Sequence, residues 1–186
     1  MRKLKSALLY TALALVANAG WADPAELSAL REGDMRKLML HSAPIAASEI
    51  GFTGADGSDM TLADYEGRYV LVNFWATWCA PCRKEMPQLS ALQEELGGDD
   101  FDVVTIATGR NPRPAMERFF EEIGVDNLPL HTDPRQALAR SMGVMGLPVT
   151  VILNPEGEEI GRLQGDADWA SDSAKAIIQA MTSQPE

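Results

Sequence analysis

The chain has 186 residues and a formal net charge of −11 at neutral pH, with 27 acidic side chains against 16 Lys and Arg. This acidic balance argues against binding to nucleic acid or to anionic membrane surfaces, because both attract positively charged proteins. The length suits one domain, and no repeat divides the sequence. Since there are only two cysteines, any sulfur chemistry is confined to a single pair.

Residues 1–22 have the features of a secretory signal peptide. A basic start over residues 1–5 is followed by an apolar stretch over residues 8–17 and by cleavage-like patterns at Ala17-Asn18-Ala19 or Gly20-Trp21-Ala22. The apolar stretch is short for a membrane span of roughly 20 residues, but its longest count approaches the lower limit of about 17. A retained N-terminal anchor is therefore the alternative, and in either case we expect the rest of the chain to lie outside the cytoplasm.

The next segments predict a small extension and the start of the main domain. Residues 23–42 carry apolar side chains at loosely helical spacing and are expected to form a helical extension that packs on the domain or tethers it. The domain itself is expected to span residues 43–186. Within it, the turn signals of Gly51–Leu62 predict a hairpin, and Leu62–Gly67 predicts a helical turn closed by glycine.

A buried strand followed by a long helix is predicted at the centre of the sequence. Val70–Trp75 is apolar except for Asn73 and predicts the buried strand, and helical periodicity extends from Cys79 to the glycines at 97 and 98. Phe101–Ala107 predicts the next strand, because it is rich in β-branched and apolar residues. Pro81 suits the first turn of the helix, where a missing N–H costs no helical bond. Pro87 is expected to bend the helix.

The remaining elements predict the fold class. Helices are expected to open at Asn111 or Pro112 and at Asp133, with a short strand near Leu130 between them. Val149–Leu153 and Glu159–Leu163 flank the turn Asn154-Pro155-Glu156-Gly157 and predict an antiparallel hairpin, and Ser171 is expected to cap a last helix. This order predicts a three-layer α/β domain with a mainly parallel central sheet, an antiparallel edge hairpin and helices on both faces.

The two cysteines lie in the motif Trp78-Cys79-Ala80-Pro81-Cys82, at the predicted junction of strand and helix. In the first turn of a helix, unpaired backbone N–H groups and the positive end of the helix dipole stabilise a thiolate. The thiolate is the nucleophile of disulfide exchange, so we assign Cys79 as the attacking residue. Cys82 follows three residues later, toward the same helical face, and is assigned as the resolving residue.

Three other interpretations of this pair were weighed. A structural zinc site needs four ligands, and the remaining candidates, His41 and His131, show no ligand spacing. A purely structural disulfide that closes so small a loop removes little chain entropy. Two buried, inert thiols fit poorly with the flanking Trp78 and Pro81, which indicate a junction rather than a core. A working thiol pair is the interpretation that we prefer.

Several motifs resemble the TlpA-type exported thiol:disulfide oxidoreductases of the thioredoxin superfamily. The resemblance covers about residues 43–181, and the segments that carry it are Val72–Pro87 around the cysteines, Gly143–Thr150, Asn154–Gly157 and Gly165–Ala170. It implies a thioredoxin-like fold with an inserted βα unit between Cys82 and Pro148.

The resemblance also implies roles for residues beyond the cysteines. Pro148 is expected to be a cis-proline that faces the pair, Leu147 to offer its backbone to an extended substrate segment, and Trp78 to form part of the rim around Cys79. The chain departs from cytoplasmic thioredoxins at Asn73, where those proteins have a buried Asp. The proton acceptor for Cys82 is therefore open, with Glu85 or water as the candidates.

From this resemblance we expect an enzyme, a periplasmic protein-disulfide reductase without a bound cofactor or metal. The expected clients are periplasmic proteins with disulfides or metal-site thiols, such as copper-handling proteins of cytochrome oxidase assembly or cytochrome c precursors. A membrane thiol-transporting reductase is the expected electron donor. The alternatives are a disulfide-forming oxidant and a binding or chaperone module. A peroxidase is weaker, because Thr77 directly precedes Trp78-Cys79 without the two-residue gap of peroxiredoxin-like sites.

Overall fold

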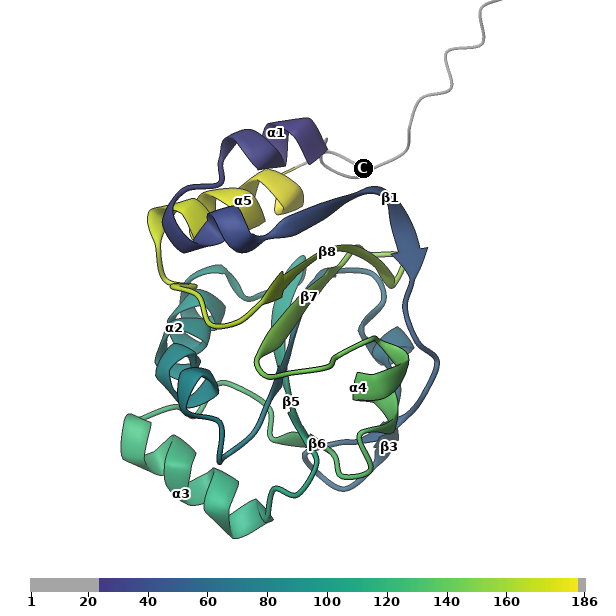
Figure 1. Ribbon diagram of the computed structural model, residues 1–186, viewed down its shortest axis with the longest axis vertical. Helices are drawn as coiled ribbons and strands as arrows, with labels where there is room; N and C mark the ends of the chain where they lie inside the picture. The colour runs from purple at the N-terminus through teal and green to yellow at the C-terminus, as the bar shows by residue number, and fades with distance from the viewer. Residues whose placement is uncertain (1–23, 184–186) are drawn as a thin grey trace, which may run out of the picture.

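The computed structural model describes residues 24–183, so the expected signal peptide lies outside the described residues. The domain is a single sheet with helices on both sides (Figure 1). Its elements, in chain order, are α1 (Pro24–Ala29), the 3-10 helix η1 (Gly33–Lys37), β1 (Met39–Ala46), β2 (Phe52–Thr53), β3 (Asp59–Met60), the 3-10 helix η2 (Leu62–Tyr65), β4 (Tyr69–Trp75), α2 (Ala80–Leu96), β5 (Phe101–Thr108), α3 (Arg113–Ile123), β6 (His131–Asp133), α4 (Ala137–Ser141), β7 (Val149–Leu153), β8 (Glu158–Gln164) and α5 (Asp172–Thr182). Across residues 24–183, no helix combines the length and the apolar character that a membrane crossing requires.

The strand order is β1-β8-β7-β4-β5-β6-β2-β3. The predicted hairpins β2–β3 and β7–β8 are both confirmed, as is the α/β fold class. The expectation of a mainly parallel sheet is wrong, because only β4–β5 and β5–β6 pair in parallel. The pairs β1–β8, β8–β7, β7–β4, β6–β2 and β2–β3 are antiparallel.

The short helix α4 explains why β7 runs against β4. A parallel neighbour would need a crossover that carries the chain back to the opposite end of the sheet. Helix α4 has five residues and at about 1.5 Å per residue cannot span that distance. Strand β7 therefore enters at the end where β6 leaves, and its first residue Val149 pairs with Phe74 near the end of β4.

The two faces of β4 build two cores. Leu71 and Trp75 point into the larger core, which contains the buried side chains of α1, α2, α3 and α5. Val70, Val72 and Phe74 point into the other core, which α4 and η2 cover. Because successive side chains of a strand alternate between its faces, Asn73 lies on the α2 side together with Leu71 and Trp75.

The N-terminal extension is helical only in part. Helices α1 and η1 bury Leu27 and Met35 against the larger core. Strand β1 then crosses the boundary that was expected between residues 42 and 43 and pairs with β8, from Met39 opposite Arg162 to Ala46 opposite Glu158. Without β1, the outer edge of β8 would be left unpaired. The extension is thus continuous with the sheet.

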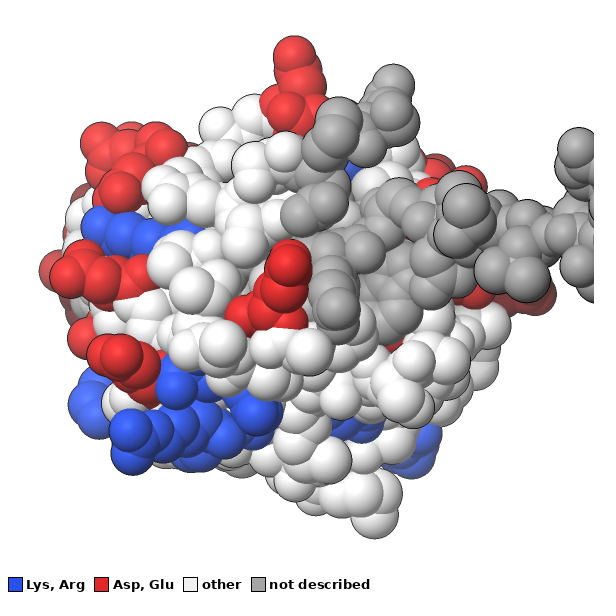
Figure 2. Space-filling view, turned by 90° about the horizontal axis from the view of Figure 1, so that it is seen from above, with Lys and Arg blue, Asp and Glu red and all other residues white. Residues whose placement is uncertain are grey.

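On the face formed by α1 and α5, the acidic side chains do not form one continuous patch. Figure 2 views the molecule from that side and shows acidic and basic side chains in separate small groups, with uncharged surface between them. One of the ion pairs around this end joins Lys37 to Asp34, 2.9 Å apart on η1. Such exposed pairs contribute little stability individually.

Candidate active site

The cysteine pair lies where β4 passes into α2, as the sequence predicts. Cys79 is the N-cap residue of α2, and Pro81 occupies the first turn. Cys79 and Cys82 form a disulfide, with their Cα atoms 5.3 Å apart. Cys79 is 6% exposed and Cys82 is fully buried. Of the two cysteines only Cys79 retains any exposure, and its assignment as the attacking residue stays a prediction.

Backbone geometry places the Cys79 sulfur at the helix terminus. The Cys82 N–H donates to Cys79 Sγ over 3.3 Å, and the Cys79 N–H donates to the Ala76 carbonyl over 3.1 Å. The first N–H groups of a helix have no intrahelical acceptor and carry its positive partial charge. A thiolate at Cys79 would therefore form where the backbone favours negative charge.

Asn111 fixes the loop before the cysteines, and sequence reasoning assigned it only to a helix start. Its Oδ1 atom accepts from the Thr77 backbone N–H (2.8 Å) and from the Thr77 hydroxyl (3.0 Å). Its Nδ2 atom donates to the Thr108 carbonyl over 3.0 Å. These bonds join the end of β5 to the loop after β4, two segments far apart in sequence.

Two exposed apolar side chains line a pocket that begins at Trp78, the residue before Cys79. Trp78 is 65% exposed and Met145 is 92% exposed. A pocket of about 250 Å³ brings together Trp78 and Leu147, and its full lining is Trp78, Thr108, Gln136, Ala139, Val144, Met145, Gly146 and Leu147. Exposed apolar side chains around a pocket are typical of binding surfaces. Met145 is a candidate contact residue that the sequence did not single out, although it lies inside the segment Gly143–Thr150 that carries the resemblance.

Pro148 occupies a different position from the other expected contact residues. The Leu147–Pro148 peptide bond is cis, the form that the resemblance implies. The Pro148 side chain is buried and is not part of the pocket lining, and its carbonyl accepts the Gly165 N–H over 2.9 Å. Cys79 and Cys82 are also absent from this lining. The structure thus brings Trp78 and Leu147 together in one pocket.

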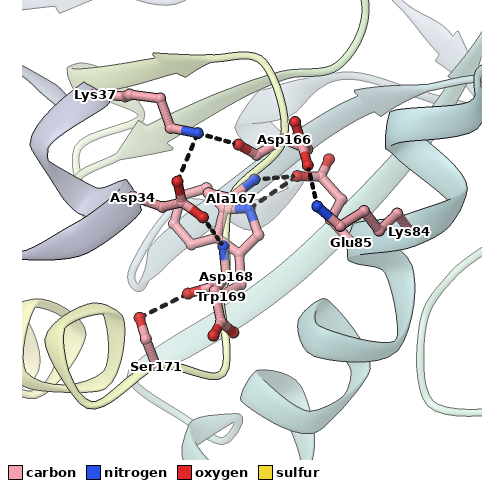
Figure 3. Close-up of polar contacts among 9 residues, drawn as sticks. All are labelled: Asp34, Lys37, Lys84, Glu85, Asp166, Ala167, Asp168, Trp169 and Ser171. Atoms are coloured by element: carbon pink, nitrogen blue, oxygen red, sulfur yellow. Dashed lines mark hydrogen bonds and ion pairs between the residues drawn. The ribbon is translucent and has the colours of Figure 1, made fainter.

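A buried carboxyl group lies one helical turn beyond Cys82. Glu85 is fully buried and follows Cys82 by three residues, so the two side chains share a face of α2. Its Oε1 atom accepts from Asn73 Nδ2 (2.9 Å). Its Oε2 atom accepts from the Ala167 N–H (3.1 Å) and from Trp169 Nε1 (3.3 Å), as Figure 3 shows.

The environment of Glu85 favours its protonated form. Burial raises the pKa of the Glu85 carboxyl to about 7, and the hydrogen bonds from Asn73, Ala167 and Trp169 oppose this rise only in part. The three hydrogen-bond donors to this carboxyl group among residues 24–183 are an amide side chain, a backbone N–H and an indole N–H, and none of them is a cation. A carboxyl group with a pKa near neutral can take up and release a proton at physiological pH.

Asn73 links this carboxyl group to the sheet. Its Nδ2 atom donates both to Glu85 and to Thr150 Oγ1, the latter over 2.9 Å. Its Oδ1 atom is buried and has no hydrogen-bond partner among the described residues. The position that carries Asp in cytoplasmic thioredoxins thus holds an amide here, and the ionisable group that it contacts is Glu85 on α2.

The histidines considered as zinc ligands lie in other parts of the fold. His41 Nε2 lies 2.8 Å from Glu159 Oε1, and His131 Nε2 lies 2.7 Å from the Tyr65 hydroxyl. Over residues 24–183, no group of three or more His, Cys, Asp or Glu side chains is placed to hold a metal ion. The cysteine pair of this structure is a disulfide.

The fold and the disulfide at the start of α2 define a thioredoxin-like protein, and comparison with known proteins agrees. The sequence profile of the AhpC/TSA family matches residues 44–158, more than half of the chain. The chain therefore belongs to the AhpC/TSA family. The resemblance to thiol:disulfide oxidoreductases noted in the sequence is confirmed at the level of this family and its named relatives.

Proteins with a similar sequence or structure are named as thiol-disulfide oxidoreductases, isomerases or thioredoxins. The thiol-disulfide oxidoreductase ResA of Bacillus subtilis (strain 168) is 31% identical over 110 residues, which are 59% of this chain and 60% of that protein. A secreted thiol-disulfide isomerase from Corynebacterium glutamicum superposes with a TM-score of 0.65 at 23% identity, over 82% of this chain and 93% of that chain. An exposed lipoprotein thioredoxin from Streptococcus pneumoniae gives 0.58 at 25% identity, over 72% and 98%. The chain spans about three fifths of the length of the curated relatives it matches.

Proposed function

We propose that this protein is a thiol:disulfide oxidoreductase that reduces disulfides in client proteins. The observation that carries the proposal is the Cys79–Cys82 disulfide at the N-terminus of α2, in which Cys79 is 6% exposed and Cys82 is fully buried. The names of the relatives, which are thiol-disulfide oxidoreductases, support the same activity. The exposed Trp78 and the adjoining pocket supply an apolar surface for the client segment around its disulfide.

The reaction proceeds through a mixed disulfide. The Cys79 thiolate attacks one sulfur of the client disulfide, so that a new S–S bond forms and the other client sulfur leaves as a thiolate. The Cys82 thiolate then attacks Cys79 Sγ, which releases the second client sulfur and forms the Cys79–Cys82 disulfide. Two electrons pass to the client in this sequence. A donor dithiol must return them to the enzyme before the next cycle.

Glu85 is the group that we assign to the Cys82 proton. Cys82 must lose its proton before it can attack, and it is buried away from solvent. Glu85 lies one turn along the same helical face, with a pKa of about 7 caused by burial. At neutral pH a fraction of Glu85 is ionised and able to accept a proton, directly or through a water molecule.

The proposal also covers the direction of electron flow, the client proteins and the location of the protein. Between Cys82 and Pro148 the chain forms β5, α3, β6 and α4, an added βα unit instead of the all-helical insert of DsbA-type oxidants. This favours a reductant. Periplasmic proteins with disulfides or metal-site thiols are the proposed clients, and a membrane thiol-transporting reductase is the proposed donor. The words secreted and exposed in the names of two structural relatives support a location outside the cytoplasm.

The reduction potential separates the reductant from the oxidant. The purified protein is equilibrated with a glutathione or dithiothreitol redox buffer, and the dithiol fraction is measured by alkylation. A reductant should show a potential well below about −200 mV, whereas a value near about −120 mV would identify a disulfide-forming oxidant.

A trapping experiment tests the roles of the two cysteines and identifies the clients. Cys82→Ser should accumulate mixed disulfides through Cys79, because nothing resolves them, and Cys79→Ser should accumulate none. The trapped partners are then identified by mass spectrometry. If Cys79→Ser retained full activity toward clients, the protein would be a binding or chaperone module and the redox proposal would fail.

A further inference from the structure

Two of the donors that hold the Glu85 carboxyl come from a loop far along the chain. Ala167 and Trp169 lie between β8 and α5, more than 80 residues after Glu85. Trp169 is 1% exposed, so its indole N–H reaches Glu85 inside the protein. This loop lies outside residues 44–158, the part that matches the family profile. The contact thus joins Glu85, inside the matched range, to a loop outside it.

The same loop is clamped from two sides by charged side chains, which Figure 3 shows around Glu85. From α2, Lys84 Nζ lies 3.0 Å from Asp166 Oδ2. From the N-terminal segment, Lys37 Nζ donates to the Asp166 carbonyl over 2.6 Å. Asp34 Oδ2 accepts the Asp168 N–H over 3.2 Å, and Asp34 also pairs with Lys37 over 2.9 Å. Every residue from Asp166 to Trp169 thus takes part in a contact that fixes the loop.

We propose that the loop Asp166–Trp169, clamped by Asp34 and Lys37 of the N-terminal segment, positions the Glu85 carboxylate and sets the pH at which it accepts a proton. Trp169 is then a positioning residue that acts through Glu85. The segment that contains η1 is a working part of the site as well as a link to the domain. The proposal rests on the proposed function only in giving Glu85 the Cys82 proton.

The sign of the effect follows from the donors. The Ala167 and Trp169 N–H groups are neutral donors that stabilise the charged carboxylate, so losing either raises the pKa of Glu85 further above its ordinary value. The negative charge of Asp166 also raises the pKa of Glu85. Lys84 and Lys37 both bind Asp166 and offset its charge.

The groups that face Glu85 from other elements do not compete with this effect. On β4 and β7 the neighbours are Asn73 and Thr150, which carry no charge. On α2 the titratable neighbours are Cys82, which is in the disulfide, and Lys84, which is directed to Asp166. The loop supplies two of the three hydrogen-bond donors that stabilise the ionised Glu85 carboxylate, and Asn73 supplies the third. The charged side chains nearest to the carboxyl group belong to the loop and its clamp.

The test measures Glu85 directly in the oxidised protein, by carbon-13 NMR titration of glutamate side-chain carboxyl groups. Trp169→Phe removes the indole donor and retains an aromatic ring, and it should raise the Glu85 midpoint by about one pH unit. Lys37→Gln, at an exposed position, should raise it by a few tenths of a unit. The matched control is Lys175→Gln, which removes a half-buried lysine of α5 that pairs with Glu95 of α2, the helix that carries Glu85, and should leave the midpoint unchanged.

If Trp169 and Lys37 only stabilised the fold, their replacement would leave the Glu85 midpoint unchanged. If Trp169→Phe and Lys37→Gln lower the melting temperature but leave the Glu85 midpoint at its wild-type value, the proposal is overturned. Lys37→Gln keeps the test valid if the buried tryptophan variant does not fold. Because the titration requires no client and no thiol reaction, a failure here is distinct from a failure of the proposed oxidoreductase activity.

A kinetic measurement adds a second readout. In the reduced protein, Trp169→Phe should move the pH profile of mixed-disulfide resolution upward by the same amount as the NMR midpoint. In a Glu85→Gln background, Trp169→Phe should cause no further change in that profile, because it acts through Glu85. A shift that persists without the carboxyl group would contradict the assignment of Trp169 as a positioning residue for it.

Discussion

At the scale of single residues, the buried carboxyl group of Glu85 makes the stability of the fold depend on pH. Its carboxyl is fully buried, and burial is the leading cause of its raised pKa. A folded-state pKa of about 7, above the ordinary value of 4.5, means that the folded protein binds a proton more tightly than the unfolded chain. Stability should therefore fall as the pH rises from the unfolded pKa to the folded pKa.

Replacing Glu85 by Gln should remove this dependence. The amide oxygen can accept from Ala167 and Trp169, and a half-turn of the Asn73 amide lets its unpartnered Oδ1 atom accept from the new NH₂ group. Between pH 5 and pH 8, we expect the oxidised wild-type protein to lose about 2 kcal/mol of unfolding free energy relative to Glu85→Gln. Urea denaturation at both pH values measures the difference, with Glu94→Gln on the exposed side of α2 as the matched control. An equal effect at the two pH values would show that Glu85 does not titrate in this window.

The site residues differ in how readily the sequence predicts them. Trp78, Cys79 and Cys82 lie within five residues. The roles of the cysteines follow from one helix terminus, and the role of Trp78 follows from the resemblance. The surroundings of Glu85 depend on Ala167 and Trp169, which reach it only after β7 and β8 have been added to the sheet. No local pattern in the sequence around Glu85 indicates that Ala167 and Trp169 contact it. The sequence therefore suggested Glu85 as a candidate without indicating what holds it.

At the scale of elements, the sequence predicts strands that have a local apolar pattern. It does not predict strands, or strand directions, that depend on a neighbouring segment of the fold. Strand β7 was predicted with its observed bounds, because it is one short apolar run closed by a turn. Its direction relative to β4 depends on the length of α4, whose start after Gln136 the sequence placed too early. Strand β1 was missed because its side chains are largely exposed, and β8 supplies the pairing that makes it a strand.

The end of α3 offers a test at this scale. Gly124 closes the helix with φ 68° and ψ 31°, and its N–H donates to the carbonyls of Glu121 and Phe120. A Cβ atom there would meet nothing within 4 Å, so only the left-handed backbone opposes a side chain. Gly124→Ala should therefore lower the unfolding free energy by about 1 kcal/mol. Gly98, which has open space and is not among the positive-φ glycines, is the matched control and should tolerate Ala without loss.

Urea denaturation of the two glycine variants measures both values under the same conditions. If Gly98→Ala were as destabilising as Gly124→Ala, the left-handed backbone of Gly124 would not be the cause of the loss, because alanine at a compatible position reduces the entropy of the unfolded chain and does not destabilise the fold. A larger loss at Gly124 alone supports the left-handed C-cap as the cause.

At the scale of the whole molecule, a buried ionic cluster joins the edge strand to the rest of the sheet. Glu159 of β8 is 2% exposed and accepts two hydrogen bonds from Arg162, each 2.6 Å long. His41 of β1 contacts the same carboxyl over 2.8 Å, and Arg162 also donates to the Met142 carbonyl after α4 over 3.1 Å. One cluster thus ties β1, β8 and the end of α4 together, across the far side of the sheet from α2.

Breaking this cluster should cost more than any exposed ion pair in the described chain. Arg162→Met keeps much of the side-chain length but leaves the Glu159 carboxylate buried without its paired donor. Loss of one partner from a buried ion pair is strongly destabilising, and we expect about 3 kcal/mol of unfolding free energy to be lost. Adding Glu159→Gln to this variant removes the uncompensated charge and should recover more than half of that loss. Urea denaturation of the single and double variants tests both steps, and a double variant as unstable as Arg162→Met would assign the cost to lost packing instead of to the buried charge.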